Sequence, residues 1–261
     1  MLYHDVVPPG QYAVSGFEGA DADIYKLQID EFKNHLREIA RAAPDAPVGA
    51  LDARHDEDSR WLLTFDDGGV SAILYTADLL EQFGWRGHFF VTTDRIGKPG
   101  FLSESQIREL HLRSHAIGSH SCTHPARMSY CTRRQLDFEW GESVQRLSQI
   151  LGEPVTAASV PGGYYSRVVA ESAAAAGLRV LFTSEPVTSP QVVDGCTVLG
   201  RFGVQQGISP QWVYSVISGR AFPRFRRYAF WNLKKLLKAA GGETWLEMRR
   251  KVLAHRASAE K

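Results

Sequence analysis

An α/β fold with a parallel sheet is the architecture that this chain predicts, on three observations. Apolar, strand-like runs such as residues 61–65, 88–92 and 116–119 alternate strictly with helical patterns. Such alternation is typical of a parallel sheet, either open or closed into a barrel. The length of 261 residues suits one domain with a full core, and a hydrophobic content of 44% is ordinary for a globular protein. No run in the sequence approaches the roughly 18 apolar residues that a membrane span needs.

The individual elements follow from apolar runs, helix caps and stop signals. The expected strands are residues 2–7, 61–65, 88–92, 116–119, 155–160, 178–183 and 197–199. The expected helices are residues 29–42, 70–83, 103–113, 132–151 and 166–176, with a last helix starting at residue 209. Ser103 and Thr132 each precede a glutamine by three residues, which is the capping-box pattern of a helix start. Gly152 is expected to stop the long helix before it.

The C-terminal segment differs from the rest of the chain in charge. Residues 220–261 contain 12 basic and 3 acidic side chains, a net charge of +9, whereas residues 1–219 carry −8. We therefore expect a globular part at 1–219 and a basic amphipathic helical tail at 220–261. The favoured expectation is that this tail packs on the globular part; the alternative is peripheral contact with an anionic membrane. Nucleic acid is not an expected partner, because the acidic globular part would repel phosphate.

Cysteine usage and the start of the chain bear on the expected compartment. Three cysteines cannot all pair within one chain, and reduced cytosolic thiols are the simplest account of them. The first residues lack the basic segment and the long apolar core of a secretory signal. We expect a cytoplasmic protein, with the inner membrane face as the site of any peripheral contact.

Two adjacent carboxylates, Asp66 and Asp67, follow the apolar run at 61–65 and precede two glycines. Active groups of α/β folds usually lie at the C-terminal ends of the strands. Gly68 and Gly69 are expected to let the backbone turn sharply and to leave room for a substrate.

A second strand end carries two histidines four residues apart, His120 and His124. Histidines at this spacing share a face of a helical turn, so both can point at one ion. Together with Asp67 they provide the three protein ligands of a catalytic metal site with one open position. Asp66 is then left to accept a proton from water. Of the remaining histidines, His88 and His115 are expected to be satisfied core residues and His35 to lie on the surface.

A third strand end continues into Pro161, Gly162, Gly163 and Tyr164. The glycines permit close backbone approach, and a free amide there is able to hold an oxyanion. The alternative is a simple strand-to-helix turn with Ser166 as the N-cap, and the two interpretations are compatible.

These three segments resemble the polysaccharide deacetylases with a NodB-homology domain, carbohydrate esterase family 4. The matching pieces are TFDDG at 64–68, HAIGSHSCTH at 115–124 and PGGY at 161–164, with Tyr3-His4 and HFFVT at 88–92 as further family elements. The resemblance covers roughly residues 1–185. It implies a distorted (β/α) barrel of about seven parallel strands at 1–219, and hydrolytic removal of N-acetyl groups from amino sugars.

The resemblance also implies roles for particular residues. Asp66 matches the general base of the family. Its metal ligands are matched by Asp67, His120 and His124. The Gly162 amide matches the oxyanion donor, and Pro161, Gly163 and Tyr164 would line the sugar groove.

The sequence departs from the family pattern in two places. Ser159 stands where the family usually has an arginine, two residues before the proline. The late Leu-x-His motif, whose histidine is the usual general acid, has no clear counterpart, and the equivalent strand offers Arg201 instead. We expect Arg201 to stabilise developing charge, and His4 or Glu185 to tune the site or donate protons.

The resulting hypothesis is a divalent-metal-dependent hydrolase that removes N-acetyl groups from an amino sugar or from a cell-surface polysaccharide or its precursor. Zn²⁺ is the first expectation for the metal, and Co²⁺, Ni²⁺ and Mn²⁺ also suit carboxylate and imidazole ligands. The enzymatic alternative is hydrolysis of another amide, such as a cyclic imide or ureide, on the same scaffold. The non-enzymatic alternative is a glycan-binding protein that kept the metal site.

Overall fold

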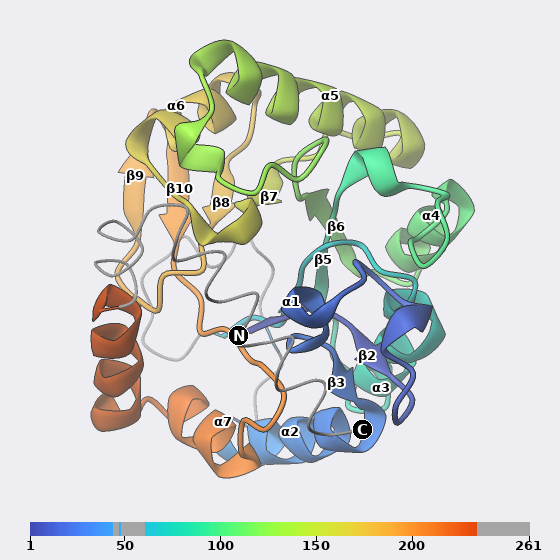
Figure 1. Ribbon diagram of the computed structural model, residues 1–261, viewed down its shortest axis with the longest axis vertical. Coiled ribbons are helices and arrows are strands. Elements are labelled where there is room, and N and C mark those ends of the chain that lie inside the picture. The colour runs from blue at the N-terminus through green and yellow to red at the C-terminus, as the bar shows by residue number, and fades with distance from the viewer. Residues whose placement is uncertain (44–46, 48–60, 234–261) are drawn as a thin grey trace.

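The computed structural model describes residues 1–43, 47 and 61–233 and forms a curled sheet surrounded by helices (Figure 1). The sheet has eight strands in the order β1-β4-β5-β6-β7-β8-β10-β9. Their bounds are β1 Leu2–Tyr3, β4 Thr64–Phe65, β5 His88–Val91, β6 Ala116–Ser119, β7 Ala157–Ser159, β8 Val180–Phe182, β9 Gln191–Val193 and β10 Cys196–Leu199. A separate pair, β2 (Val6–Val7) and β3 (Leu27–Gln28), is also parallel.

The sheet is parallel from β1 to β10, and only the edge strand β9 is antiparallel. The segment after β10 returns to β1: the Leu2 N–H donates to the Phe202 carbonyl, and the Val204 N–H donates to the Leu2 carbonyl, both over 2.9 Å. The two ends of the parallel array are thereby joined. The expected distorted (β/α) barrel with about seven parallel strands is confirmed.

Helices cover the outside of the barrel. They are α1 Ala20–Asp23, α2 Ile29–Ala42, α3 Ala77–Glu81, α4 Glu104–Leu112, α5 Arg133–Leu151, α6 Arg167–Ala175 and α7 Pro210–Ile217. A further helix spans residues 221–233 and is drawn in red in Figure 1. Within the described residues, no helix combines the length and the apolar character needed to cross a membrane.

The helix predictions from caps hold well. The predicted range 29–42 coincides with α2, and both capping boxes, at Ser103 and Thr132, form with side-chain and backbone hydrogen bonds. Gly152 ends α5 in the left-handed conformation, with φ 75°. Ser166 occupies the N-cap position of α6, but its side chain makes no capping hydrogen bond.

Several elements differ from the prediction, and the short elements α1 and β3 were not predicted. The run at 2–7 is split into β1 and β2, which pair in different sheets, because the chain leaves the barrel at His4 and Asp5. The predicted helix at 70–83 begins as a π-helix, Ala72–Thr76, before α3. The edge strand β9 was not predicted; two of its three residues are exposed, so it lacks the apolar run of a buried strand.

Strand alternation decides which side chains face the barrel interior. Successive side chains of a strand point to opposite faces. In β5, Phe90 contacts Phe182 inside the barrel, whereas Phe89 and Val91 pack outward in the large core cluster with the helices. Asp66 lies two residues beyond the inward-facing Thr64. Polar residues that lie two positions beyond an inward-facing strand residue therefore also face the barrel interior, where they approach one another.

His88 has the same parity as Phe90 and is therefore buried inside the barrel, with 4% of its surface exposed. Neither ring nitrogen has a hydrogen-bond partner among the described residues, so the expectation of a satisfied core histidine is wrong for this side chain. His115, in contrast, accepts from the Gly87 N–H and lies 3.1 Å from Glu81 Oε1. His35 was expected at the surface but is fully buried on α2, where its Nε2 lies 2.8 Å from the Ile208 carbonyl.

Burial of His88 predicts a pH-dependent loss of stability. Burial lowers the pKa of His88 from 6.5 to about 4. Because the unfolded chain binds this proton more readily, the stabilising contribution is complete above pH 6.5 and is lost as the pH falls toward 4. The pKa difference corresponds to about 3 kcal/mol in the free energy of unfolding.

Chemical denaturation of the wild type and of His88→Leu at neutral and acidic pH tests this expectation. The wild type should lose about 3 kcal/mol more than the leucine variant between pH 6.5 and 4. His111→Leu on α4 controls for removal of a surface imidazole. Equal acid sensitivity of the wild type and His88→Leu would contradict the prediction.

Candidate metal centre

Asp67, His120 and His124 come together at the C-terminal end of the barrel strands. Asp67 Oδ1 lies 3.3 Å from His120 Nε2 and 3.5 Å from His124 Nε2. One ligand atom from each residue lies within 4.8 Å of the others. Ligands about 2.0–2.1 Å from a tetrahedral ion are about 3.3–3.5 Å apart, so this donor set fits a single divalent cation.

The two histidines do not share a helical turn, contrary to the expectation from their spacing. Residues 120–124 form a bend, in which Ser121 has φ 64° and His124 has φ 61°. This turn brings the two imidazole centroids to 5.1 Å. Asp67 is also left-handed, with φ 78°. Left-handed backbone is uncommon outside glycine and concentrates at functional sites.

His120 is oriented from behind by Ser159. Its Nδ1 lies 2.6 Å from Ser159 Oγ and 3.1 Å from the Ser159 carbonyl oxygen. A carbonyl oxygen only accepts, so the proton of this ring belongs on Nδ1. The lone pair of Nε2 then points toward Asp67 and is available to a metal. Hydrogen bonds of this kind fix the tautomer of metal-binding histidines.

Asp66 is held by Arg201 in a buried, bidentate ion pair. Arg201 Nη1 donates to Oδ1 and Nη2 to Oδ2, each over 2.7 Å, and both side chains are almost completely buried. The guanidinium also donates to the Thr183 carbonyl and to Thr64 Oγ1. Its guanidinium carbon lies 5.7 Å from the ring centroids of both Phe90 and Phe182, which contact one another.

The Arg201 contact keeps Asp66 charged. Burial alone would raise the pKa of Asp66, but attraction to Arg201 and then to His120 outweighs burial and lowers it below the usual value. Arg201 thus holds the carboxylate in place and in its ionised form. Its guanidinium points at Asp66 from inside the barrel, which is a different task from the predicted stabilisation of developing charge.

Asp67 and His124 polarise one another. Burial opposes ionisation of Asp67, yet its close contacts with His120 and His124 hold its pKa well below the usual range. Burial likewise opposes protonation of His124, but the contact with Asp67 raises the pKa of this imidazole. The ionised Asp67 carboxylate therefore favours a positive charge at the point where the three ligand atoms meet.

The two glycines after the carboxylates make room for protein atoms. A Cβ at Gly69 would meet Asp5 Oδ1 at 2.0 Å, and a Cβ at Gly68, which has φ +81°, would meet the backbone of Val91 at 3.1 Å. Asp5 is buried and accepts hydrogen bonds from Ser15 and Ser71. The turn expected at Gly68 is present, but the space at Gly69 is filled by Asp5 and leaves none for substrate.

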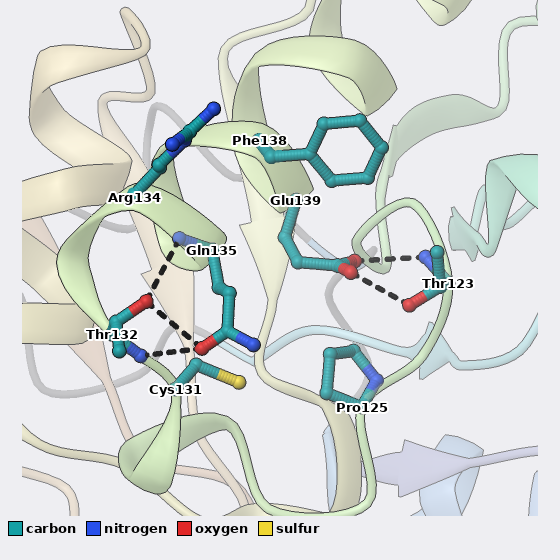
Figure 2. Close-up of a pocket in the computed structure, with 8 residues that line it drawn as sticks. All are labelled: Thr123, Pro125, Cys131, Thr132, Arg134, Gln135, Phe138 and Glu139. Carbon is teal, nitrogen blue, oxygen red and sulfur yellow. Dashed lines mark hydrogen bonds between the residues drawn. The ribbon is translucent and has the colours of Figure 1, made fainter.

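The histidine loop is tied to α5 by Glu139, a residue that the sequence analysis missed. The Glu139 carboxylate accepts from the Cys122 N–H, the Thr123 N–H and the Thr123 hydroxyl over 2.6–2.9 Å. Figure 2 shows Glu139 and Thr123 facing one another beside a pocket of about 500 Å³. The available indication was a carboxylate on the buried stripe of α5, next to Trp140.

Removal of the Glu139 carboxylate should weaken metal binding without touching a ligand. We expect Glu139→Met to raise the metal Kd by about 10–100-fold, the usual effect of losing an outer-shell partner. Glu139→Gln should cost much less, because the amide oxygen still accepts from both backbone N–H groups. Competition with a chromogenic chelator measures the affinity, and Glu142→Met on the exposed side of α5 is the matched control. Unchanged affinity in Glu139→Met would contradict this role.

The predicted rim residues lie in a 3-10 turn, Pro161–Gly163, after β7. Gly162 has φ +62°, and a Cβ there would lie 3.0 Å from the Ala126 carbonyl. Gly163 packs against Trp231 and Ser184, and Tyr164 lies edge-on to Tyr130 at 6.4 Å. The turn is therefore shaped by protein contacts; binding of substrate by these residues stays a prediction.

His4 and Glu185 are placed differently with respect to the carboxylates. His4 follows β1, stacks near Tyr25 at 4.6 Å, and its buried Nδ1 has no hydrogen-bond partner among the described residues. Its charge acts on both Asp66 and Asp67, lowering their pKa values. Glu185 contributes its main-chain carbonyl, which accepts from the Arg201 N–H. A role of His4 or Glu185 in proton transfer stays a prediction.

The fold and the site define a class: a (β/α) barrel with an Asp-His-His constellation and a second, buried carboxylate beside it. A family model described as polysaccharide deacetylase matches residues 53–181. The resemblance noted from the sequence motifs is thus confirmed over this segment.

One curated relative and two solved structures are similar to this chain. YxkH of Bacillus subtilis (strain 168), which carries the name of the same family, is 26% identical over 148 residues, covering 57% of this chain and 52% of the relative. The chain thus matches about half the length of that curated relative. The Streptococcus pyogenes deacetylase PplD has a TM-score of 0.66 at 18% identity, covering 81% of this chain and 93% of its own. IcaB from Ammonifex degensii has a TM-score of 0.65 at 18% identity, covering 84% and 95%.

Proposed function

We propose that the protein is a divalent-metal-dependent hydrolase that releases acetate from N-acetylated amino sugars of a polysaccharide or of its precursor. One observation carries the proposal: three ligand atoms lie within 4.8 Å of one another, while a fourth side chain, Asp66, is kept ionised beside them. Asp67, His120 and His124 would hold the ion. When bound, a divalent ion polarises an acyl oxygen and makes water a better nucleophile near neutral pH.

The residues of the chain then divide the proton transfers between them. Asp66 takes the proton of the attacking water, and Arg201 holds the carboxylate in the orientation and charge state that this requires. The Gly162 N–H donates a hydrogen bond to the acyl oxygen as negative charge develops there. His4 donates a proton to the departing amine. The products are acetate and a free amino sugar.

Zn²⁺ is the proposed metal, because one carboxylate and two imidazoles with an open position make a common catalytic zinc set. Co²⁺, Ni²⁺ and Mn²⁺ are alternatives with the same ligands. Metal analysis of protein purified without chelators identifies the ion.

Acetate release from N-acetylglucosamine oligomers and from nucleotide-linked N-acetyl sugars tests the function. We expect release that a chelator abolishes and added metal restores, and that Asp67→Asn loses together with bound metal. A metal-loaded protein that releases acetate from none of these substrates would overturn the proposal. Ring opening of a cyclic imide or ureide would support the alternative hydrolase, and glycan binding that is unaffected by Asp66→Asn would support a binding protein.

A further inference from the structure

The helix at residues 221–233 presents two unlike stripes along its length. One contains Arg224, Arg227 and Trp231, at spacings of three and four residues. The other contains Phe222, Phe225, Arg226, Ala229 and Leu233, at the spacings that form one face of a helix.

The stripe of Arg224, Arg227 and Trp231 faces the barrel. Arg224 donates to the Val216 carbonyl over 2.7 and 3.0 Å. Arg227 donates to the Gly203 carbonyl over 2.7 Å and lies over the Trp212 ring at 5.6 Å. A Cβ on Gly163 would meet the Trp231 ring at 3.1 Å. These contacts fix how the helix is rotated and place its C-terminal half beside the predicted substrate rim.

The aromatic stripe therefore faces outward. Phe222 is 74% exposed, Phe225 is 66% exposed and Leu233 is 53% exposed. Arg226, one turn beyond Phe222, is exposed on the same face. The described part of the tail packs on the barrel through Arg224 and Arg227, but its solvent-facing side carries large apolar groups beside Arg226, where a basic face was expected. Residues 234–261 of the predicted tail lie outside the described residues. Contiguous exposed apolar groups mark an interaction site.

Charge selects the kind of partner. The segment that carries this face has a net charge of +9 in the sequence, and the remainder of the chain has −8. A second copy of this face would bring like charges together. An anionic bilayer would accept the phenyl rings among its headgroups, attract the arginines and repel the rest of the molecule. We propose that this face docks on an anionic lipid bilayer, which brings the rim at Gly163 close to the membrane surface.

Vesicle co-sedimentation with the full chain tests the docking. Phosphatidylcholine vesicles containing about one-third phosphatidylglycerol should bind the wild type, and pure phosphatidylcholine should bind it at least about tenfold more weakly. The double variant Phe222→Ser/Phe225→Ser should reduce partitioning about tenfold or more, since two deeply inserting rings are lost. Arg226→Glu should reduce it about fivefold or more.

Matched controls lie on other faces of the molecule. Leu112→Ser removes an equally exposed apolar group from α4, where Leu112 is 83% exposed, and Arg134→Glu reverses an exposed charge on α5. Both should bind anionic vesicles as the wild type does. The proposal is overturned if the wild type ignores anionic vesicles, if the controls weaken binding as much, or if size-exclusion chromatography shows a dimer that only the Phe222/Phe225 variant loses. Binding is measured without turnover, so the result is independent of the proposed deacetylation.

Discussion

Asp66→Asn is expected to lower kcat for acetate release by about 10²–10⁴-fold, the usual contribution of a general base. The amide keeps the size of the side chain and one oxygen acceptor for Arg201, but it has no negative charge with which to take a proton. Metal content should stay at the wild-type level, because the three ligand residues are unchanged. Steady-state kinetics on an N-acetylglucosamine oligomer, together with metal analysis, measures both quantities.

The matched control for Asp66→Asn is Asp78→Asn, which removes an exposed carboxylate that pairs with Arg113 on the barrel exterior. This control should retain wild-type kcat. If Asp66→Asn keeps wild-type kcat with a full complement of metal, Asp66 is not the base, and the division of roles between the two adjacent carboxylates must be revised.

Arg201→Met is the second substitution with a large expected effect. It leaves the fully buried Asp66 carboxylate without its partner, and loss of one member of a buried ion pair typically costs about 3–5 kcal/mol in the free energy of unfolding. With Arg201 present, the pKa of Asp66 is below its unfolded value. The stabilisation by the pair is therefore complete above the ordinary carboxyl range and is lost as the pH falls through the folded pKa.

Without Arg201, burial dominates and raises the pKa of Asp66, so the sign of the pH effect reverses. Stability of the variant should then fall as the pH rises through the ordinary carboxyl range. The acidic limb of the pH–rate profile should move to higher pH, since the base must first lose a proton. Denaturant titrations at several pH values and a kcat/KM profile measure the two effects. Wild-type stability and an unmoved acidic limb would rule out the role assigned to Arg201.

Two further variants separate positioning from simple destabilisation. Placing the cation on β7, with Ser159→Arg in the Arg201→Met background, should recover part of the activity, because position 159 is where the family pattern has its arginine. Asp66→Asn/Arg201→Met should be less destabilised than the sum of the single variants, by about 0.5–3 kcal/mol, because the two side chains act on each other.

The Arg201–Asp66 ion pair explains how Asp66 is kept in place although the chain departs from the family pattern. Ser159 sits where the family usually has an arginine, and its hydroxyl bridges His120 Nδ1 and Asp66 Oδ1. The cation comes instead from Arg201, beyond β10. Both side chains reach Asp66 because Ser159, the last residue of β7, and Arg201, two residues beyond β10, face the barrel interior. Compared with the family pattern, the cation that pairs with Asp66 therefore comes from the end of β10 and not from β7.

Local features of the chain determined the parallel α/β class, the order of most elements and the identity of the candidate ligands, whereas the barrel was implied by the family resemblance. These features are short-range patterns: apolar runs, the capping boxes at Ser103 and Thr132, and the motif at 64–68. Each depends on backbone hydrogen bonds or on strand alternation among neighbouring residues. For the same reason the range of α2 was predicted to the residue. The prediction that the carboxylates and imidazoles lie close together likewise required only the general rule that the C-terminal ends of parallel strands lie at one edge of the sheet.

The tertiary structure alone decided what these groups contact. Arg201 and Asp66 are 135 residues apart in sequence, and Glu139 reaches the histidine loop from a separate helix. The left-handed backbone at Asp67 and His124 is likewise visible only in the folded structure. The burial of His35, the unpartnered nitrogens of His88 and the outward aromatic stripe at 222–233 depend on which elements meet. Such contacts arise only when distant segments are packed together, and no local pattern of residues encodes that choice.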